Sequence, residues 1–231
     1  MSTVFFLFCG MISENVYGGL AMRMRRIKWA VEYLDEANCL VRKPEEYKGK
    51  WKELLNTDQL HVEIGCGKGN YSLNMSKLYP EQGYVAIEKN ESAAGIAAKK
   101  YDTDLEKGNL VLINGDAENL SDWFGNQEID VIHLNFSDPW PKNRYAKRRL
   151  SSSKFLEGYK TVLSADGEVQ MKTDNAKLFT YSLLEFQNAG FKMVEVDVDY
   201  RKEPHPEDVL TEYEEKFVAN NQAIYRCVWK R

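Results

Sequence analysis

The sequence predicts an α/β fold in which a seven-stranded, mostly parallel sheet with one antiparallel strand carries helices on both faces. Two observations support this prediction. From residue 59 onward, short apolar runs alternate with segments of helical spacing, a pattern typical of parallel strands joined by covering helices. The last two apolar runs, 191–198 and 223–229, have no long helix between them, so one of the two is expected to insert antiparallel.

The predicted elements follow one another along the chain without a repeat. Strands are expected at 59–64, 83–87, 109–113, 129–136, 167–172, 191–198 and 223–229. Helices are expected at 70–79, 91–107, 151–163, 175–189 and, more briefly, 208–218. Pro80 and Gly190 end two of these helices, and serines at 151–153 are candidate N-caps for a third. Ligands of such sheets bind beyond the carboxyl ends of the strands, so the loops there are the first candidates for a site.

Length and composition indicate how the chain is divided into domains. A chain of 231 residues with 43% hydrophobic residues is ordinary for one globular domain. We expect this domain at 59–231, an N-terminal extension at 22–58 and a leader outside the core at 1–21. The leader lacks the basic front of a signal peptide and is too short to span a bilayer. The four cysteines form no C-x-x-C pair, which argues against a zinc site or a disulfide framework and for a reducing, cytoplasmic setting.

A basic segment interrupts an otherwise acidic chain. The formal net charge of −4 speaks against nucleic acid, but residues 140–149 hold five cations and no anion. The segment overlaps Asp138-Pro139-Trp140-Pro141, which follows the predicted strand 129–136. The prolines stiffen this turn, the carboxylate and the flat ring can bind a nucleobase, and the cations can bind phosphates. The segment can therefore bind RNA locally.

The first predicted strand opens into a glycine-rich loop beside an acid. Glu63 precedes Gly65, Gly67 and Gly69 in a G-x-G-x-G spacing, which matches neither the dinucleotide fingerprint nor a phosphate loop ending in Lys-Ser/Thr. The glycines allow a ligand to approach the backbone closely, and the acid suits a cationic ligand better than a pyrophosphate. S-adenosylmethionine, which carries an ammonium and a sulfonium but no phosphate, fits this description.

Two further acids stand at the ends of the next two predicted strands. Glu88 can accept hydrogen bonds from both hydroxyls of a ribose, and Asp116 can accept one from an adenine amino group. Three acids at successive strand ends indicate this ligand more specifically than the glycine loop does alone. The alternative that each acid caps the following helix stays open, above all for Asp116.

Together these motifs resemble a known family. Residues 59–138 are similar to the Rossmann-like S-adenosylmethionine-dependent methyltransferases. The motif 138–142 narrows the resemblance to the bacterial-type tRNA (guanine-N7-)-methyltransferase family, over about 22–231. Further motifs that carry it are Arg25-Arg26, Gly115-Asp116-Ala117, Lys172-Thr173-Asp174 and 211–217.

The resemblance implies an activity and a set of site residues. The family transfers a methyl group from S-adenosylmethionine to N7 of the variable-loop guanosine, position 46, of tRNA. Cofactor contacts are expected from Glu63, Gly65, Gly67, Glu88, Asp116 and Asp138. Guanosine contacts are expected from Lys142, Asp174, Thr211, Glu212, Tyr213 and Glu214. Contacts to tRNA are expected from Arg144, Lys147, Arg148 and Arg149. We expect a cytoplasmic monomer or homodimer that uses neither a metal nor a membrane.

One carboxylate is expected to be central to the methyl transfer. Guanine N7 has a free lone pair and no proton, so positioning rather than a strong base is the main catalytic requirement. We expect Asp138 to be the catalytic residue, because it can bind the N1/N2 edge and oppose the charge that develops on the ring. Asp174 can hold the same edge, and His61 and His133, within apolar strands, are expected to be core residues. Two alternatives stay open: a methyltransferase of a small molecule or a protein, and an RNA-binding module with a vestigial cofactor site.

Overall fold

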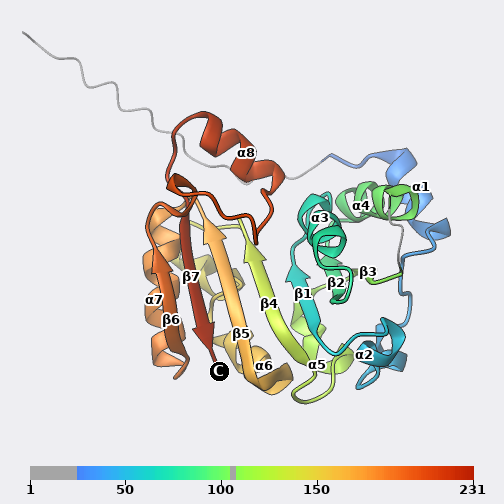
Figure 1. The fold of residues 1–231 in the computed structure, drawn as a ribbon, viewed down its shortest axis with the longest axis horizontal. Coiled ribbons are helices and arrows are strands. Elements are labelled where there is room, and N and C mark those ends of the chain that lie inside the picture. Colours follow the sequence, from blue (N-terminus) through green and yellow to red (C-terminus); the bar gives the residue numbers. More distant parts are fainter. Residues whose placement is uncertain (1–24, 105–107) are drawn as a thin grey trace, which may run out of the picture.

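The predicted seven-stranded sheet is confirmed by the computed structural model, which describes residues 25–104 and 108–231. The strand order is β3-β2-β1-β4-β5-β7-β6 (Figure 1). All neighbours from β3 to β5 pair in parallel, and β7 pairs antiparallel with both β5 and β6. The one reversed strand is therefore the last one. The expected leader, 1–21, lies outside the described residues.

The bounds of the expected elements agree with the structure to within a few residues, with two exceptions. The helices Lys28–Glu36, Trp51–Leu54 and Leu120–Trp123 were not predicted. The strands are β1 Leu60–Ile64, β2 Gly83–Glu88, β3 Leu110–Asn114, β4 Ile129–Asn135, β5 Leu163–Thr173, β6 Lys192–Asp197 and β7 Tyr225–Lys230. The described helices are α1 Lys28–Glu36, α2 Trp51–Leu54, α3 Asn70–Leu78, α4 Glu91–Asp104, α5 Leu120–Trp123, α6 Ser153–Val162, α7 Ala176–Asn188 and α8 Glu212–Ala219. One exception is β5, which begins four residues before the expected 167–172.

The other exception is the last helix, which was expected at 208–218. It begins only at Glu212, because Thr211 and Glu214 form a capping box. The Thr211 hydroxyl accepts the Glu214 N–H (3.1 Å), and Glu214 accepts the Thr211 N–H (2.9 Å). Residues 208–211 therefore form a loop that leads into α8.

Helices cover both faces of the sheet, as expected. One apolar cluster joins α3 and α4 to β2 and β3, and the other joins α5, α6 and α7 to the opposite face. Gly95 lets α1 pack closely on α4, since a Cβ on it would lie 1.8 Å from the Ala30 carbonyl oxygen. Trp51 from α2 is fully buried, and its indole N–H donates to the Trp123 carbonyl (2.8 Å). The segment before β1 thus packs into the core, and its separation from the main domain at residue 58 stays a prediction.

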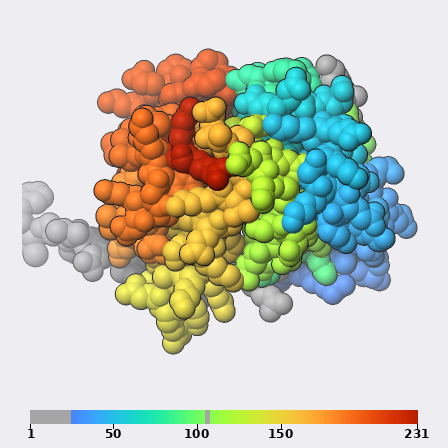
Figure 2. All heavy atoms as spheres, turned by 90° about the horizontal axis from the view of Figure 1, so that it is seen from below, coloured from blue at the N-terminus to red at the C-terminus, as the bar shows by residue number. Residues whose placement is uncertain are grey.

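The direction of the strands gives the sheet two different edges. The parallel strands end at the upper edge in Figure 1, where α8 lies across them. The reversed strand β7 ends at the lower edge, and its C-terminal residues reach the surface there (Figure 2, red). Within the described ranges, no helix is long and apolar enough to cross a membrane. The upper edge holds the motifs that the sequence singled out.

Candidate active site

The glycine loop after β1 leaves free space above the strand end. Gly65, Gly67 and Gly69 have φ angles of 78°, 58° and 79°, in the left-handed region that side chains rarely adopt. A Cβ on Gly65 or Gly67 would meet no atom within 4 Å. A Cβ on Gly69 would instead lie 2.5 Å from the Tyr101 hydroxyl, so this third glycine is needed for packing. The loop has room for a ligand at its first two glycines.

Glu88 ties this loop to the end of β2. The Gly67 N–H donates to Glu88 Oε2 (2.9 Å), and the Asn90 N–H donates to Oε1 (2.7 Å). Burial raises the pKa of Glu88, the two N–H groups lower it, and the nearby carboxylate of Asp138 raises it. The carboxylates that follow β2 and β4, the strands on either side of β1, are therefore near enough to interact. Each Glu88 oxygen keeps a lone pair for a ligand.

Asp116, at the end of β3, has two partners inside the protein. Its Oδ1 accepts the Glu118 N–H (3.1 Å), which makes it the N-cap of a short 3₁₀ turn. Its Oδ2 pairs with the Lys89 ammonium. The capping role that the sequence left open is therefore present, and the expected contact with adenine stays a prediction.

Glu63 lies beneath the glycine loop rather than in it. Its buried carboxylate accepts hydrogen bonds from the Ser72 hydroxyl and from the Asn135 amide (3.0 Å). Burial raises the pKa of Glu63, although these two donors act to lower it. The residue joins the start of α3 to the end of β4 and so shapes the site from below. A direct contact with the cofactor stays a prediction.

Asp138 stands on a stiff turn beyond β4. Phe136 and Trp140, two residues before and after it, have φ angles of 51° and 42°, which are costly for bulky side chains. Such strain persists only where surrounding groups hold it. Arg149 does so for the turn, donating to the carbonyls of Pro139 (2.9 Å) and Trp140 (3.0 Å). The Asp138 side chain is exposed and accessible to a ligand.

Arg149 is placed differently from its basic neighbours. We expected it to contact tRNA, yet it is only 9% exposed and its guanidinium carbon lies 4.2 Å from the centroid of the Tyr181 ring. Its N–H donors are directed at the carbonyls of the turn. In the structure Arg149 therefore supports the turn that carries Asp138, and its expected contact with tRNA stays a prediction.

Three exposed cations, Arg144, Lys147 and Arg148, form what we call the basic cluster, on the 3₁₀ helix Asn143–Arg148. The Arg144 guanidinium lies 4.8 Å from the centroid of Tyr145. The Arg148 guanidinium lies 5.0 Å from the centroids of both Tyr145 and Trp140. Stacking on the rings restricts the guanidinium groups and leaves N–H donors free. Lys142, also exposed, lies between Asp138 and this cluster in the chain.

The segment 211–214, expected to bind the substrate, divides into buried and exposed residues. Thr211 and Glu214 are buried and bond to each other as the capping box. Glu212 pairs with Lys100 (3.0 Å) and Lys68 (3.4 Å). Tyr213 is 57% exposed. Tyr213 is the most exposed of the four residues, and the expected substrate contacts of all four stay predictions.

Asp174 follows β5 and is half-buried. Its Oδ2 accepts a hydrogen bond from the Gln222 amide (3.2 Å), and burial raises the pKa of its carboxyl. It stands at the strand end next to that of Asp138, since β4 and β5 pair in parallel. Its expected contact with the guanosine stays a prediction.

The two strand histidines are core residues in a hydrogen-bonded chain. The Tyr71 hydroxyl donates to Asp208 (2.9 Å) and lies 3.2 Å from His133 Nδ1. Because that hydroxyl has a single proton, it accepts from His133 Nδ1–H, and His133 Nε2 in turn accepts from His61 Nδ1–H (3.0 Å). This order leaves His61 Nε2 as a bare acceptor, buried without a hydrogen-bond partner among the described residues. Both imidazoles are therefore neutral.

We predict that this pair makes the fold sensitive to acid. Burial lowers the pKa of His61 to about 4 and that of His133 well below its usual range. The unfolded chain takes up the His61 proton near pH 6.5 and the folded chain only near pH 4, so stability falls as pH drops between these values. From pH 7 to pH 5, His61 costs about 2 kcal/mol. Denaturant unfolding of the wild type and of His61→Phe at both pH values checks this, and equal losses would contradict it.

Within the described ranges, no group of His, Cys, Asp or Glu side chains could hold a metal ion. Cys39, Cys66 and Cys227 are free and buried. Burial raises the pKa of the Cys66 thiol, so this residue of the glycine loop is a neutral packing group.

Similarity to known proteins decides the family. The family model described as "Putative methyltransferase" matches residues 57–227. A tRNA (guanine-N(7)-)-methyltransferase from Oceanobacillus iheyensis is 45% identical over 208 residues, which cover 89% of this chain and 97% of that protein. The chain belongs to the tRNA (guanine-N(7)-)-methyltransferase family. Other relatives of that name are 43% identical in Bacillus velezensis (89% of this chain, 95% of that one) and 42% identical in Lactococcus lactis (89% and 96%).

Solved structures place this member of the tRNA (guanine-N(7)-)-methyltransferase family in a wider fold. A methyltransferase described as antibiotic-related gives a TM-score of 0.59 at 16% identity, over 79% of this chain and 94% of that one. The 16S rRNA methyltransferase KamB gives 0.58 at 14% identity, over 79% and 92%. A SAM-dependent methyltransferase from Aquifex aeolicus gives 0.54 at 14% identity, over 89% and 99%. At these identities the likeness shows the fold alone, and it confirms the expected Rossmann-like class.

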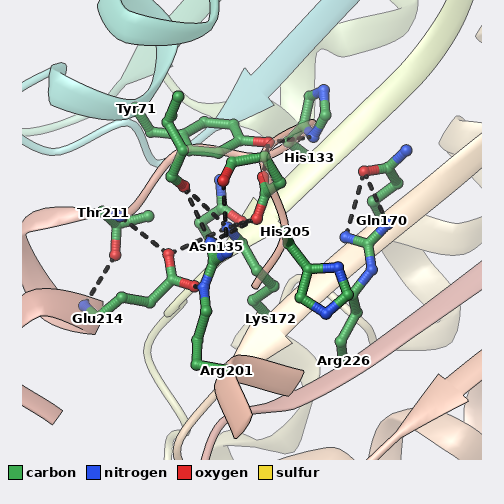
Figure 3. Close-up of polar contacts among 12 residues, drawn as sticks. Tyr71, His133, Asn135, Gln170, Lys172, Arg201, His205, Thr211, Glu214 and Arg226 are labelled. Atoms are coloured by element: carbon green, nitrogen blue, oxygen red, sulfur yellow. Dashed lines mark hydrogen bonds and ion pairs between the residues drawn. The ribbon is translucent and has the colours of Figure 1, made fainter. Parts of the chain in front are cut away.

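The sequence did not reveal a cluster of four buried charges beneath α8. Lys172 and Arg201 face Asp208 and Glu214 across the end of β5 (Figure 3). One signal was available: a lysine near the end of a predicted central strand, 167–172, needs acidic partners if it is buried. Nothing in the sequence pattern identifies those partners, which come from a loop and a helix far along the chain.

Proposed function

We propose that the protein transfers the methyl group of S-adenosylmethionine to N7 of a guanosine in tRNA. The observation that carries this proposal is the position of Asp138. Its exposed carboxylate interacts electrostatically with Glu88, which binds the glycine loop through the Gly67 N–H, and the basic cluster follows it in the chain. A cationic methyl donor and an RNA base can therefore meet at one carboxylate. The names of the relatives support the same reaction.

The residues present fit S-adenosylmethionine. Gly65 and Gly67 leave open space beside the strand end, and Glu88 has acceptor capacity for ribose hydroxyls. The acids Glu63, Glu88 and Asp138 suit the positive charge of the ligand, while Asp116 stands at the next strand end for the adenine. When bound, the cofactor supplies an electrophilic methyl group on its sulfonium. The chain's own task is to orient that group and the base.

We infer the roles of the substrate residues from the same geometry. Guanine N7 attacks with its own lone pair, so proximity and alignment are the main catalytic terms. Asp138 accepts from the N1/N2 edge and opposes the positive charge that develops on the ring. Asp174 holds the same edge, Lys142 binds a phosphate or a base oxygen, and Tyr213 offers its ring to the base. The variable-loop guanosine at position 46 is the target that the family resemblance implies.

The assembly and location of the protein complete the proposal. The substrate is tRNA, which is present in the cytoplasm, and the buried free thiols are compatible with that reducing setting. We propose that the protein is a monomer or a homodimer.

The decisive experiment maps the methylated atom. Unmodified tRNA is incubated with the enzyme and methyl-labelled S-adenosylmethionine, and the product is digested and sequenced chemically at N7-methylguanosine. We expect label on N7 of guanosine 46, and none on a matched tRNA in which adenosine replaces that guanosine. Label on another base, or on protein, would contradict the proposal and favour one of the alternative methyltransferases.

A further inference from the structure

Four charged side chains lie buried together beneath the first turn of α8. Lys172 Nζ is 2.7 Å from Asp208 and 3.0 Å from Glu214, and Arg201 is 2.6 Å from Asp208 and 2.8 Å from Glu214 (Figure 3). We call these four residues the buried ion cluster. Their side chains are between 0% and 9% exposed. Two cations balance two anions, so the cluster is neutral as a whole.

The anions of the cluster organise the loop that enters α8. Glu214 also accepts the Thr211 N–H, which closes the capping box. Arg201 and Lys172 both reach the Val209 carbonyl, at 3.1 Å and 3.4 Å. The stretch from 208 to 214 is thereby fixed by the two cations. Tyr213 belongs to this stretch, and the cluster therefore sets where its exposed ring stands.

The backbone of Lys172 connects the same cluster to the turn that carries Asp138. The Phe136 N–H donates to the Lys172 carbonyl (2.8 Å). The Phe136 ring stacks on Tyr213 and Phe217 of α8, with centroid separations of 6.1 Å and 5.7 Å. The left-handed φ of Phe136 is thus held between its backbone bond to Lys172 and its ring contact with α8.

We propose that Lys172 is a positioning residue for the methyl-transfer reaction. Its carbonyl fixes the Asp138 turn, its side chain fixes the Tyr213 segment, and Asp174 follows two residues later in the chain. Through these three connections it sets the spacing of the groups that would hold the guanine. The inference rests on the proposed function.

The buried ion cluster should contribute more to the geometry of the site than to the stability of the fold. Buried ion pairs contribute little net stability, because the loss of hydration offsets their attraction. Their hydrogen bonds are directional, and in this cluster each charged group has two charged partners. A misplacement of about 1 Å at a reacting base can cost about 10²-fold in rate. Losing the cluster should therefore affect turnover more than folding.

The experiment removes Lys172 without leaving an uncompensated buried charge. The double variant Lys172→Met with Asp208→Asn keeps the Arg201–Glu214 pair and the Tyr71 hydrogen-bond acceptor at 208. We expect kcat on tRNA to fall about 10- to 100-fold, while KM for tRNA and the Kd of S-adenosylmethionine change less than about threefold. A kcat within twofold of the wild type, measured well below the unfolding temperature, would overturn the proposal.

A control separates positioning from mere loss of a buried cation. Arg226 on β7 is also buried, and it pairs with Glu195 of β6 (2.6 Å) instead of with the α8 segment. Arg226→Met should lower the unfolding temperature and leave kcat unchanged. If the double variant does not fold, Arg201→Gln removes the other cation of the cluster, and an unchanged kcat there also overturns the proposal. Wild-type enzyme that labels no guanosine N7 would instead refute the proposed function.

Discussion

Replacing Asp138 by Asn should lower kcat on tRNA by about 10² to 10³-fold, the loss typical of removing one group that stabilises transition-state charge. The substitution keeps the shape of the side chain and removes its charge. The turn should persist, since it is held by Arg149 and not by Asp138 itself. What is lost is the negative group opposite a ring that becomes positive as N7 is methylated.

Calorimetry on the same variant separates the two functions of Asp138. If the carboxylate acts on guanine alone, the Kd of S-adenosylmethionine stays within about threefold; if it also holds the cofactor, that Kd rises together with the fall in kcat. Asp166→Asn is a matched control, because Asp166 is exposed on β5 at the opposite edge of the sheet. Full turnover by the Asp138 variant would remove this residue from the mechanism.

Neutralising the basic cluster should weaken tRNA binding and make it less sensitive to salt. In the triple variant Arg144→Gln, Lys147→Gln, Arg148→Gln, three cations no longer displace counterions from phosphates. The slope of log K against log salt concentration should become shallower by about 2 to 3, and affinity near 0.1 M salt should fall about 10- to 100-fold. At saturating tRNA, kcat should be nearly unchanged, because the cluster binds phosphates and not the reacting base.

The control removes the same charge from another surface. Lys77, Lys192 and Lys230 are exposed and lie at the lower edge, at the end of α3, the start of β6 and the end of β7. Their replacement by Gln changes the net charge equally and should leave the salt slope as in the wild type. Equal slopes for the wild type and the cluster variant would show that tRNA binds elsewhere.

The fold was predictable because its signals are local. Alternating apolar and helical runs defined each strand. The lack of a long helix between 191–198 and 223–229 indicated that one of these two strands is reversed, and the reversed strand is β7. The late start assigned to β5 and the helix start assigned to Asp208 were wrong. In the first case, polar residues such as Asp166 hid the exposed part of a strand. In the second case, the Thr-x-x-Glu signature of a capping box was present, but its residues were interpreted as contacts to the substrate.

The site was predictable in its strand-end positions and less so in its partners. The sequence placed Glu88, Asp138 and Asp174 at strand ends, and the parallel register brings these ends to one edge. It could not show that Arg149 turns inward or that Lys172 meets charges from residues 36 and 42 positions away. Such contacts depend on how segments far apart in the chain pack together. No pattern in the sequence links these segments.

The reversed direction of β7 makes Arg231 a convenient point for attachment. The Arg231 N–H donates to the Gly167 carbonyl (3.1 Å), and its guanidinium donates to the Leu163 carbonyl (2.9 Å), so the last residue is anchored to β5. It lies at the face seen in Figure 2, away from the edge with α8. A fluorophore or a surface tether attached at Arg231 therefore lies away from the edge with α8 and leaves the face that we propose for tRNA open to solution.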